Sequence, residues 1–161
     1  MQDKYKLAID LIKRYEGYEE HPYLDAVGVP TIGFGTTVYE DGTPVTLHDK
    51  PITVTRAEEL LLTYLYESNR VINEVVRPHM SPEAMAAMLS LCYNIGNNAF
   101  KRSSVVNYLN AGNKAFAADM FLLWVRGENR TLPGLVKRRM SEMVLFCKGE
   151  GIELNLPYID A

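Results

Sequence analysis

Residues 16–37 read EGYEEHPYLDAVGVPTIGFGTT, and the local character of the chain changes at their start. In the preceding residues, apolar side chains at positions 5, 8, 9, 12 and 15 follow the spacing of one helix face. Gly17 is a natural helix stop, so residues 1–15 are predicted to form an N-terminal helix. Glu16 therefore stands at the carboxyl end of that predicted helix.

The residues after Glu16 favour turns and short strands. Glycine and proline recur between residues 17 and 44, and the segments 31–34 and 36–39 are typical of strands. Asp41-Gly42 is a typical hairpin turn. We expect this small β-containing lobe to span about residues 16–55.

The remainder of the chain is predicted to be helical. Thr55 and Glu58 resemble a capping box that opens a long amphipathic helix ending before Pro78, and this helix is expected to join two lobes. Ser81-Pro82 opens another helix, and glycines at 96, 112, 127 and 149 are expected to separate further helical segments. The predicted fold class is α+β, mainly α. We expect a single domain over residues 1–161, with the connecting helix and an all-helical lobe at about 56–161.

Composition places the chain among soluble globular proteins. Of its 161 residues, 47% are hydrophobic and 23% are charged. The apolar runs are too short to span a bilayer, and the charged first residues do not resemble an export signal. Cys92 and Cys147 each lie within an apolar helical pattern, which predicts buried reduced thiols rather than a disulfide bond.

The charges are distributed unevenly. Residues 1–100 carry 8 basic and 14 acidic side chains, whereas residues 101–161 carry 9 basic and 6 acidic ones, for a net charge of −3. The second part either attracts an anionic polymer or is simply a solvated helix surface. No basic stripe with interleaved aromatic residues points to nucleic acid. His21, His48 and His79 show no metal-ligand spacing, so we expect no metal and no cofactor.

Three residues near the start of the chain fit the chemistry of glycosidic bond cleavage, which needs a protonated acid and an ionised carboxylate. The partial negative charge at a helix carboxyl end favours the neutral form of Glu16. Turn amides and solvent would keep Asp25 charged, and the hydroxyl of Thr31 could hold a water molecule beside it. Taken alone, this pattern favours a surface glutamate, a turn-capping aspartate and a strand threonine.

The surrounding residues decide between these readings, because they resemble the active-site block of the phage-type lysozyme (endolysin, muramidase) family. Two later blocks of that family have counterparts here, in the same order, and the resemblance runs from about residue 5 to 148. The matching positions are Glu16-Gly17, 23–25, Gly28 and 31–35; then 93–96, Phe100, Ser103, Ser104 and 109–112; then 133–135, Arg138, Arg139, Glu142 and Phe146.

The resemblance implies a lysozyme-like two-lobed fold that binds polysaccharide in the cleft between its lobes. It implies hydrolysis of the β-1,4 bond between N-acetylmuramic acid and N-acetylglucosamine in bacterial peptidoglycan, with inversion and host cell lysis. In that family the glutamate at the Glu16 position is the acid, the aspartate at the Asp25 position the base, and the threonine at the Thr31 position holds the water.

The same resemblance suggests where substrate binds. The expected contacts are Gly35, Thr37, Tyr93, Asn94 and Ser103. Tyr93 either stacks on a sugar face or packs in the core, and glycine at position 35 permits close approach of the polysaccharide. Arg138 and Arg139 either belong to a solvated helix face or include a partner for Glu16.

The expected partner is bacterial peptidoglycan, and we expect a monomer. The chain is more acidic than many relatives and lacks the N-terminal apolar segment that some of them use for export. We therefore expect synthesis in the host cytoplasm and action on the wall in the periplasm or outside, either after removal of a leader or with the help of a separate pore protein. The alternatives are a lytic transglycosylase, which would need neither Asp25 nor Thr31, and a non-catalytic wall-binding module of the same fold.

Overall fold

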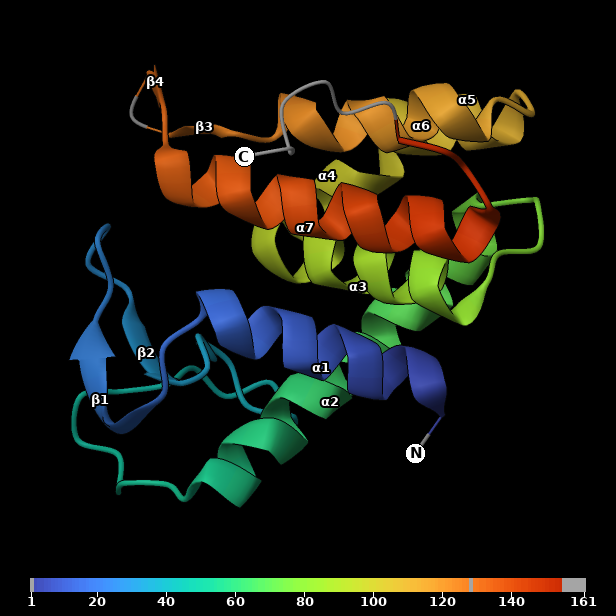
Figure 1. Cartoon of the computed structure of the whole chain (residues 1–161). Coiled ribbons are helices and arrows are strands. Elements are labelled where there is room, and N and C mark those ends of the chain that lie inside the picture. The colour runs from blue at the N-terminus through green and yellow to red at the C-terminus, as the bar shows by residue number, and fades with distance from the viewer. Residues whose placement is uncertain (1, 128, 155–161) are drawn as a thin grey trace.

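The protein is mainly helical, with a small β section at one side (Figure 1). The computed structural model describes residues 2–127 and 129–154. Its elements, in chain order, are α1 (Asp3–Tyr15), β1 (Glu19–Leu24), β2 (Pro30–Gly33), α2 (Val54–Val75), α3 (Pro82–Ile95), α4 (Asn97–Lys101), α5 (Ser104–Asn110), α6 (Lys114–Met120), the 3₁₀ helix η1 (Phe121–Leu123), β3 (Arg126–Gly127), β4 (Arg130–Thr131) and α7 (Pro133–Glu150). The predicted α+β, mainly α class is confirmed.

Helix α1 ends where its sequence predicts. Tyr5, Ala8, Ile9 and Ile12 are buried on one face, which packs against α3. Glu16 is the C-cap residue, with extended backbone (φ −98°, ψ 120°), and its amide donates to the carbonyl of Ile12 at 2.8 Å. The chain then turns directly into β1, so the fold carries Glu16 at the junction of helix and β section (Figure 1).

Helix α3 forms the centre of the helical lobe, packed between α1 and α7 (Figure 1). Every residue from 84 to 92 is buried, as expected for a helix that is apolar on all sides. The predicted cap at its start is confirmed, because the Ser81 hydroxyl accepts from the amide of Ala84 at 3.1 Å and Pro82 occupies the first turn.

Helix α2 connects the β section to the helical lobe, as predicted, but the predicted capping box was wrong. The N-cap is Thr53, whose hydroxyl accepts from the amide of Arg56 at 3.1 Å, and Thr55 lies inside the helix. Both threonines are residues that favour the N-cap position, so local sequence does not separate them. The helix spans 22 residues, about 33 Å at 1.5 Å per residue.

The β section contains one antiparallel pair, β1 with β2, in which Tyr23 faces Thr31. The predicted strand at 36–39 was wrong: those residues form only isolated bridges, one from Thr36 and one from Val38. The predicted turn at Asp41-Gly42 is confirmed by a bond of 3.0 Å from the Gly42 amide to the carbonyl of Tyr39. Pairing is short because turns interrupt the chain on both sides of each segment.

The helical lobe is not all helix, contrary to the prediction. Gly127 lies in β3 of a small hairpin rather than between helices. Gly149 lies inside α7, whose C-cap is Gly151 at φ +65°. A Cβ at position 149 would come within 2.2 Å of the Ser81 hydroxyl oxygen, so glycine is required there by close packing of α7 on the start of α3 rather than by the end of the helix.

Cys92 and Cys147 are buried free thiols, as predicted. Among residues 2–127 and 129–154, no helix is both long and apolar enough to cross a membrane.

Candidate active site

The carboxylate of Glu16 is held from one side by an arginine of α7. Arg138 Nη1 donates to Glu16 Oε1 at 2.7 Å, and the arginine side chain is 3% exposed against 29% for the glutamate. The hypothesis that an arginine of this pair contacts Glu16 is thus confirmed for Arg138. Glu16 Oε2 faces Gly35, where a Cβ would lie 3.5 Å from Oε2 and equally far from the Tyr93 hydroxyl. One oxygen is paired with a cation, and the other faces the β section.

Asp25 lies in the turn between β1 and β2. Its Oδ1 accepts from the amides of Val27 at 3.0 Å and Val29 at 2.8 Å, as the turn composition predicts. These bonds orient the side chain and stabilise negative charge on Oδ1. Within the described residues, Oδ2 has no hydrogen-bond partner, so this oxygen is free to accept a proton.

Thr31 is linked to Asp25 through Val29. The Thr31 hydroxyl donates to the Val29 carbonyl at 2.9 Å, while the Val29 amide donates to Asp25. The side chain is 3% exposed, so the hydroxyl is nearly enclosed. Because its proton is used in this bond, the oxygen can accept from a water molecule but does not donate to one.

Four of the predicted substrate contacts line the same pocket, which has a volume of about 450 Å³. They are Gly35, Thr37, Tyr93 and Asn94. The Tyr93 hydroxyl donates to the carbonyl of Phe34 at 2.6 Å and so joins α3 to the β section. Burial, followed by the Glu16 carboxylate, raises the pKa of Tyr93 well above its ordinary value, so the phenol is a neutral donor. Tyr93 therefore both packs and lines the pocket.

Ser103, the fifth predicted contact, is not brought to this pocket. It is the N-cap of α5, where its hydroxyl accepts from the amide of Val106 at 3.5 Å, and it is 3% exposed. A capping role accounts for serine at this position.

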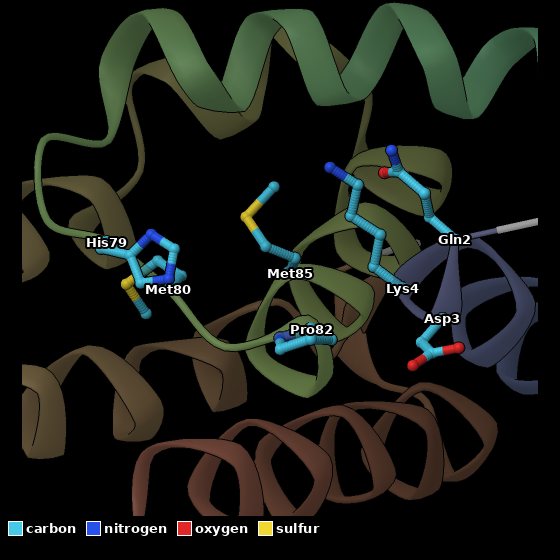
Figure 2. A pocket seen from close by; sticks show the side chains of 7 residues that line it. All are labelled: Gln2, Asp3, Lys4, His79, Met80, Pro82 and Met85. Carbon is cyan, nitrogen blue, oxygen red and sulfur yellow. The ribbon is translucent and has the colours of Figure 1, made fainter.

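A second pocket, of about 480 Å³, lies near the start of α1 (Figure 2). Its lining includes Lys4 at the start of α1, and His79 and Met85 beside or within α3. Glu16 follows the opposite end of α1, about 20 Å away along a helix that rises 1.5 Å per residue. This pocket is therefore separate from the carboxylates described above.

Glu142 was not singled out by the sequence analysis as a functional residue, although it lies close to the site. It is fully buried between Arg138 and Arg139, with Nε to oxygen distances of 3.3 Å and 3.1 Å. Ser90 of α3 donates to it at 2.6 Å. The sequence could have indicated these ion pairs, because Arg139 and Arg138 precede Glu142 by three and four residues on one helix.

Gly35 offers a direct test of the space beside Glu16. Substitution by alanine places a methyl group against Glu16 Oε2 at a position with φ +96°, and we expect activity to fall about 10- to 100-fold. The matched control is Gly42→Ala, which has a similar φ of +86° and open space around it. Lysis rates and melting temperatures of both variants check this prediction, and equal losses of activity would contradict it.

Comparisons with known proteins identify the family of this chain. The family described as Phage lysozyme matches residues 13–142. The endolysin of Salmonella phage P22 is 38% identical over 139 residues, which are 86% of this chain and 93% of that protein. The solved endolysin from Escherichia coli O157:H7 phage FAHEc1 superposes with a TM-score of 0.79 at 32% identity, covering 88% of this chain and 90% of that one.

A further solved structure, the muramidase domain of SpmX from Asticaccaulis excentricus, is 30% identical with a TM-score of 0.70 over 86% of this chain and 93% of that one. The matched family region contains Glu16, Asp25, Thr31 and Arg138. Because that region spans most of the chain, and because the P22 relative is covered almost completely, this chain belongs to the phage lysozyme family.

Proposed function

We propose that the protein is an endolysin that hydrolyses the β-1,4 bond between N-acetylmuramic acid and N-acetylglucosamine in bacterial peptidoglycan. The observation that carries this proposal is the position of Glu16, which is held by Arg138 at the end of α1, with its second oxygen turned toward Gly35 of the pocket. A partly exposed carboxyl group beside a pocket lined by sugar-compatible side chains suits a general acid.

In the proposed reaction, Glu16 Oε2 donates its proton to the leaving glycosidic oxygen. A water molecule whose hydrogen is accepted by the Thr31 hydroxyl loses its other proton to Asp25 Oδ2, and its oxygen bonds to the anomeric carbon as the glycosidic bond breaks. The bonds that fix Asp25 Oδ1 and Thr31 to Val29 support this division of roles, because they leave one acceptor on each residue. Water attack from the side opposite Glu16 inverts the anomeric carbon.

The proposed saccharide contacts are Gly35, Thr37, Tyr93 and Asn94. An aromatic ring and an amide on adjacent positions of α3 suit a sugar face and its acetamido group. Glycine at position 35 allows the polysaccharide to approach the backbone closely.

We also propose that one chain suffices for activity and acts as a single domain, because Glu16, Asp25, Thr31 and Arg138 all come from the same chain. The substrate lies in the bacterial wall, whereas a phage protein is made in the host cytoplasm. Passage through a separate pore protein is the proposed route between the two.

Product analysis separates hydrolysis from transglycosylation. Since Asp25 and Thr31 are proposed to deliver water, digestion of purified peptidoglycan should accumulate reducing-end N-acetylmuramic acid. Mass spectrometry of the muropeptides, with and without borohydride reduction, measures this. Predominant 1,6-anhydro products would favour a transglycosylase, and no soluble product would favour a wall-binding module.

A further inference from the structure

Three charged side chains of α7 form a buried ion-pair network that contacts two residues of the proposed site. The network consists of Arg138, Glu142 and Arg139, which are 3%, 0% and 0% exposed. At one end, Arg138 bonds to Glu16 at 2.7 Å. At the other end, Arg139 Nη2 donates to Asn94 Oδ1 at 2.7 Å. The proposed acid and a proposed saccharide contact are therefore connected through a single buried carboxylate.

Glu142 occupies the middle of this network, and every contact it makes is with a donor. Oε1 accepts from Ser90 Oγ at 2.6 Å and from Arg138 Nε at 3.3 Å, and Oε2 lies 3.1 Å from Arg139 Nε. Burial raises the pKa of Glu142, whereas Arg139, the Ser90 hydroxyl and Arg138 oppose that rise. With a guanidinium nitrogen within 3.3 Å of each of its oxygens, the side chain acts as a carboxylate. Removing one member of such a network leaves the others buried without a counter-charge.

The network also determines the orientation of the Asn94 amide. Arginine has only donors, so the atom of Asn94 that faces Arg139 must be the carbonyl oxygen. Among the described residues the amide nitrogen makes no hydrogen bond, so it remains available as a donor at the pocket that Asn94 lines. A donor in this place recognises an acceptor, such as the acetamido carbonyl of the substrate.

We infer that Glu142 is a positioning residue that fixes the Glu16 acid through Arg138 and the Asn94 amide through Arg139 at the same time. This inference rests on the proposed function. Glu142 itself is fully buried and does not touch the substrate. Its effect on the reaction passes through two guanidinium groups. Arg138 contacts Glu16, and Arg139 contacts Asn94, which lines the pocket.

Because Glu142 carries a charge, its positioning role predicts a change in the pH dependence of activity. Glu16 and Glu142 contact the same guanidinium group, and the carboxylate of Glu142 neutralises one of two adjacent cations. Without it, the excess positive charge stabilises the ionised form of Glu16. The acid then loses its proton at lower pH, so the basic limb of the pH–activity profile moves to lower pH.

The groups that surround these two carboxylates come from three elements. Those that interact with Glu16 or Glu142 are Tyr23 on β1, Cys92 and Tyr93 on α3, and Arg138 and Arg139 on α7. Burial raises the pKa of Tyr93 and Cys92 and lowers that of Arg139 to about 10. Tyr93 and Cys92 therefore stay neutral and Arg139 stays charged over the neutral range, in which the limb is measured.

The test compares Glu142→Gln with Glu142→Asp and with a control on the same helix. The control is Glu150→Gln, which also loses an ion pair, to Lys114, but lies at the far end of α7; its remaining oxygen can still accept from the Ser81 amide. Initial rates on purified peptidoglycan are measured across pH, with melting temperatures for each variant. Wild type and Glu16→Gln are included, because activity in the first and its loss in the second establish the proposed function independently.

We expect Glu142→Gln to lower kcat/KM about 10- to 100-fold and to move the basic limb down by about one pH unit. Glu142→Asp should also lower the rate but leave the limb near its wild-type position, since the charge is kept. Glu150→Gln should change neither rate nor limb. A folded Glu142→Gln variant with the wild-type rate and limb would overturn the inference while leaving the proposed function intact.

A double variant keeps the inference testable if Glu142→Gln does not fold. Glu142→Met combined with Arg139→Met removes a buried ion pair together, an exchange that is often neutral or stabilising. Asn94 then loses its anchor and Arg138 loses one of its two carboxylates, so we expect kcat/KM to fall about tenfold or more in a stable protein. A stable double variant with full activity would show that the network serves the fold alone and would overturn the inference.

Discussion

Replacing Glu16 by glutamine is expected to lower the rate of peptidoglycan hydrolysis about a thousandfold, because the amide has the shape of the carboxyl group but no proton to donate. The structure predicts little damage to the fold. Arg138 keeps its contacts with Glu142 and with the carbonyl of Ser90, and a glutamine oxygen can still accept from its Nη1. We therefore expect a melting temperature within a few degrees of wild type.

Turbidity loss of a wall suspension and thermal melts measure both parts of this prediction. The matched control is Glu20→Gln, an exposed glutamate on β1 whose side chain makes no bond within the described residues. It should retain full activity. Retained lysis by Glu16→Gln would show that Glu16 is not the general acid. A large fall in melting temperature would show that Glu16 is mainly structural.

The second large effect is expected at Asp25. Asparagine at this position can still accept from the amides of Val27 and Val29, so the turn should persist, but it cannot take a proton from water. We expect activity to fall about 100-fold or more. A defined oligosaccharide followed by NMR should show the α-anomer first in the wild-type reaction, since inversion of a β-linkage requires it. Inverting enzymes separate their carboxyl groups by roughly 6.5–9.5 Å to admit the water molecule.

Thr31 provides the control for this mechanism. Thr31→Ser keeps the hydroxyl that bonds to the Val29 carbonyl and should retain most activity, whereas Thr31→Ala removes the acceptor and should lower kcat more than it raises KM. Initial formation of the β-anomer would contradict the proposal and would identify Asp25 as a nucleophile.

Local sequence was sufficient to predict the backbone positions of Glu16 and Asp25. The helical spacing of residues 5, 8, 9, 12 and 15 together with Gly17 placed Glu16 at a helix end, and the structure agrees within one residue. The turn that holds Asp25 was likewise predicted, because its bonds run to amides only two and four residues away. Contacts over such short separations depend on backbone preference and on few other residues.

Local sequence did not determine which threonine caps α2 or whether residues 36–39 form a strand. Thr53 and Thr55 are both suitable N-caps, and the structure uses the first. The start of α2 also packs on the β section, since a Cβ at Gly33 would lie 3.0 Å from the Ala57 Cβ, and local sequence does not specify such a contact. The segment 36–39 has strand composition but no long partner strand, because strand pairing depends on neighbours that propensity does not specify.

The sequence by itself therefore predicted that Glu16 ends a helix and that Asp25 lies in an amide-rich turn, but left open whether Arg138 and Arg139 are solvated or include a partner for Glu16. Only the tertiary structure decided which arginine pairs with Glu16. The two side chains are adjacent in sequence and point about 100° apart around α7, so their partners are set by the helices packed on each face. Burying both against α3 leaves no water to solvate them, and each guanidinium must then find its counter-charge in Glu16 or Glu142.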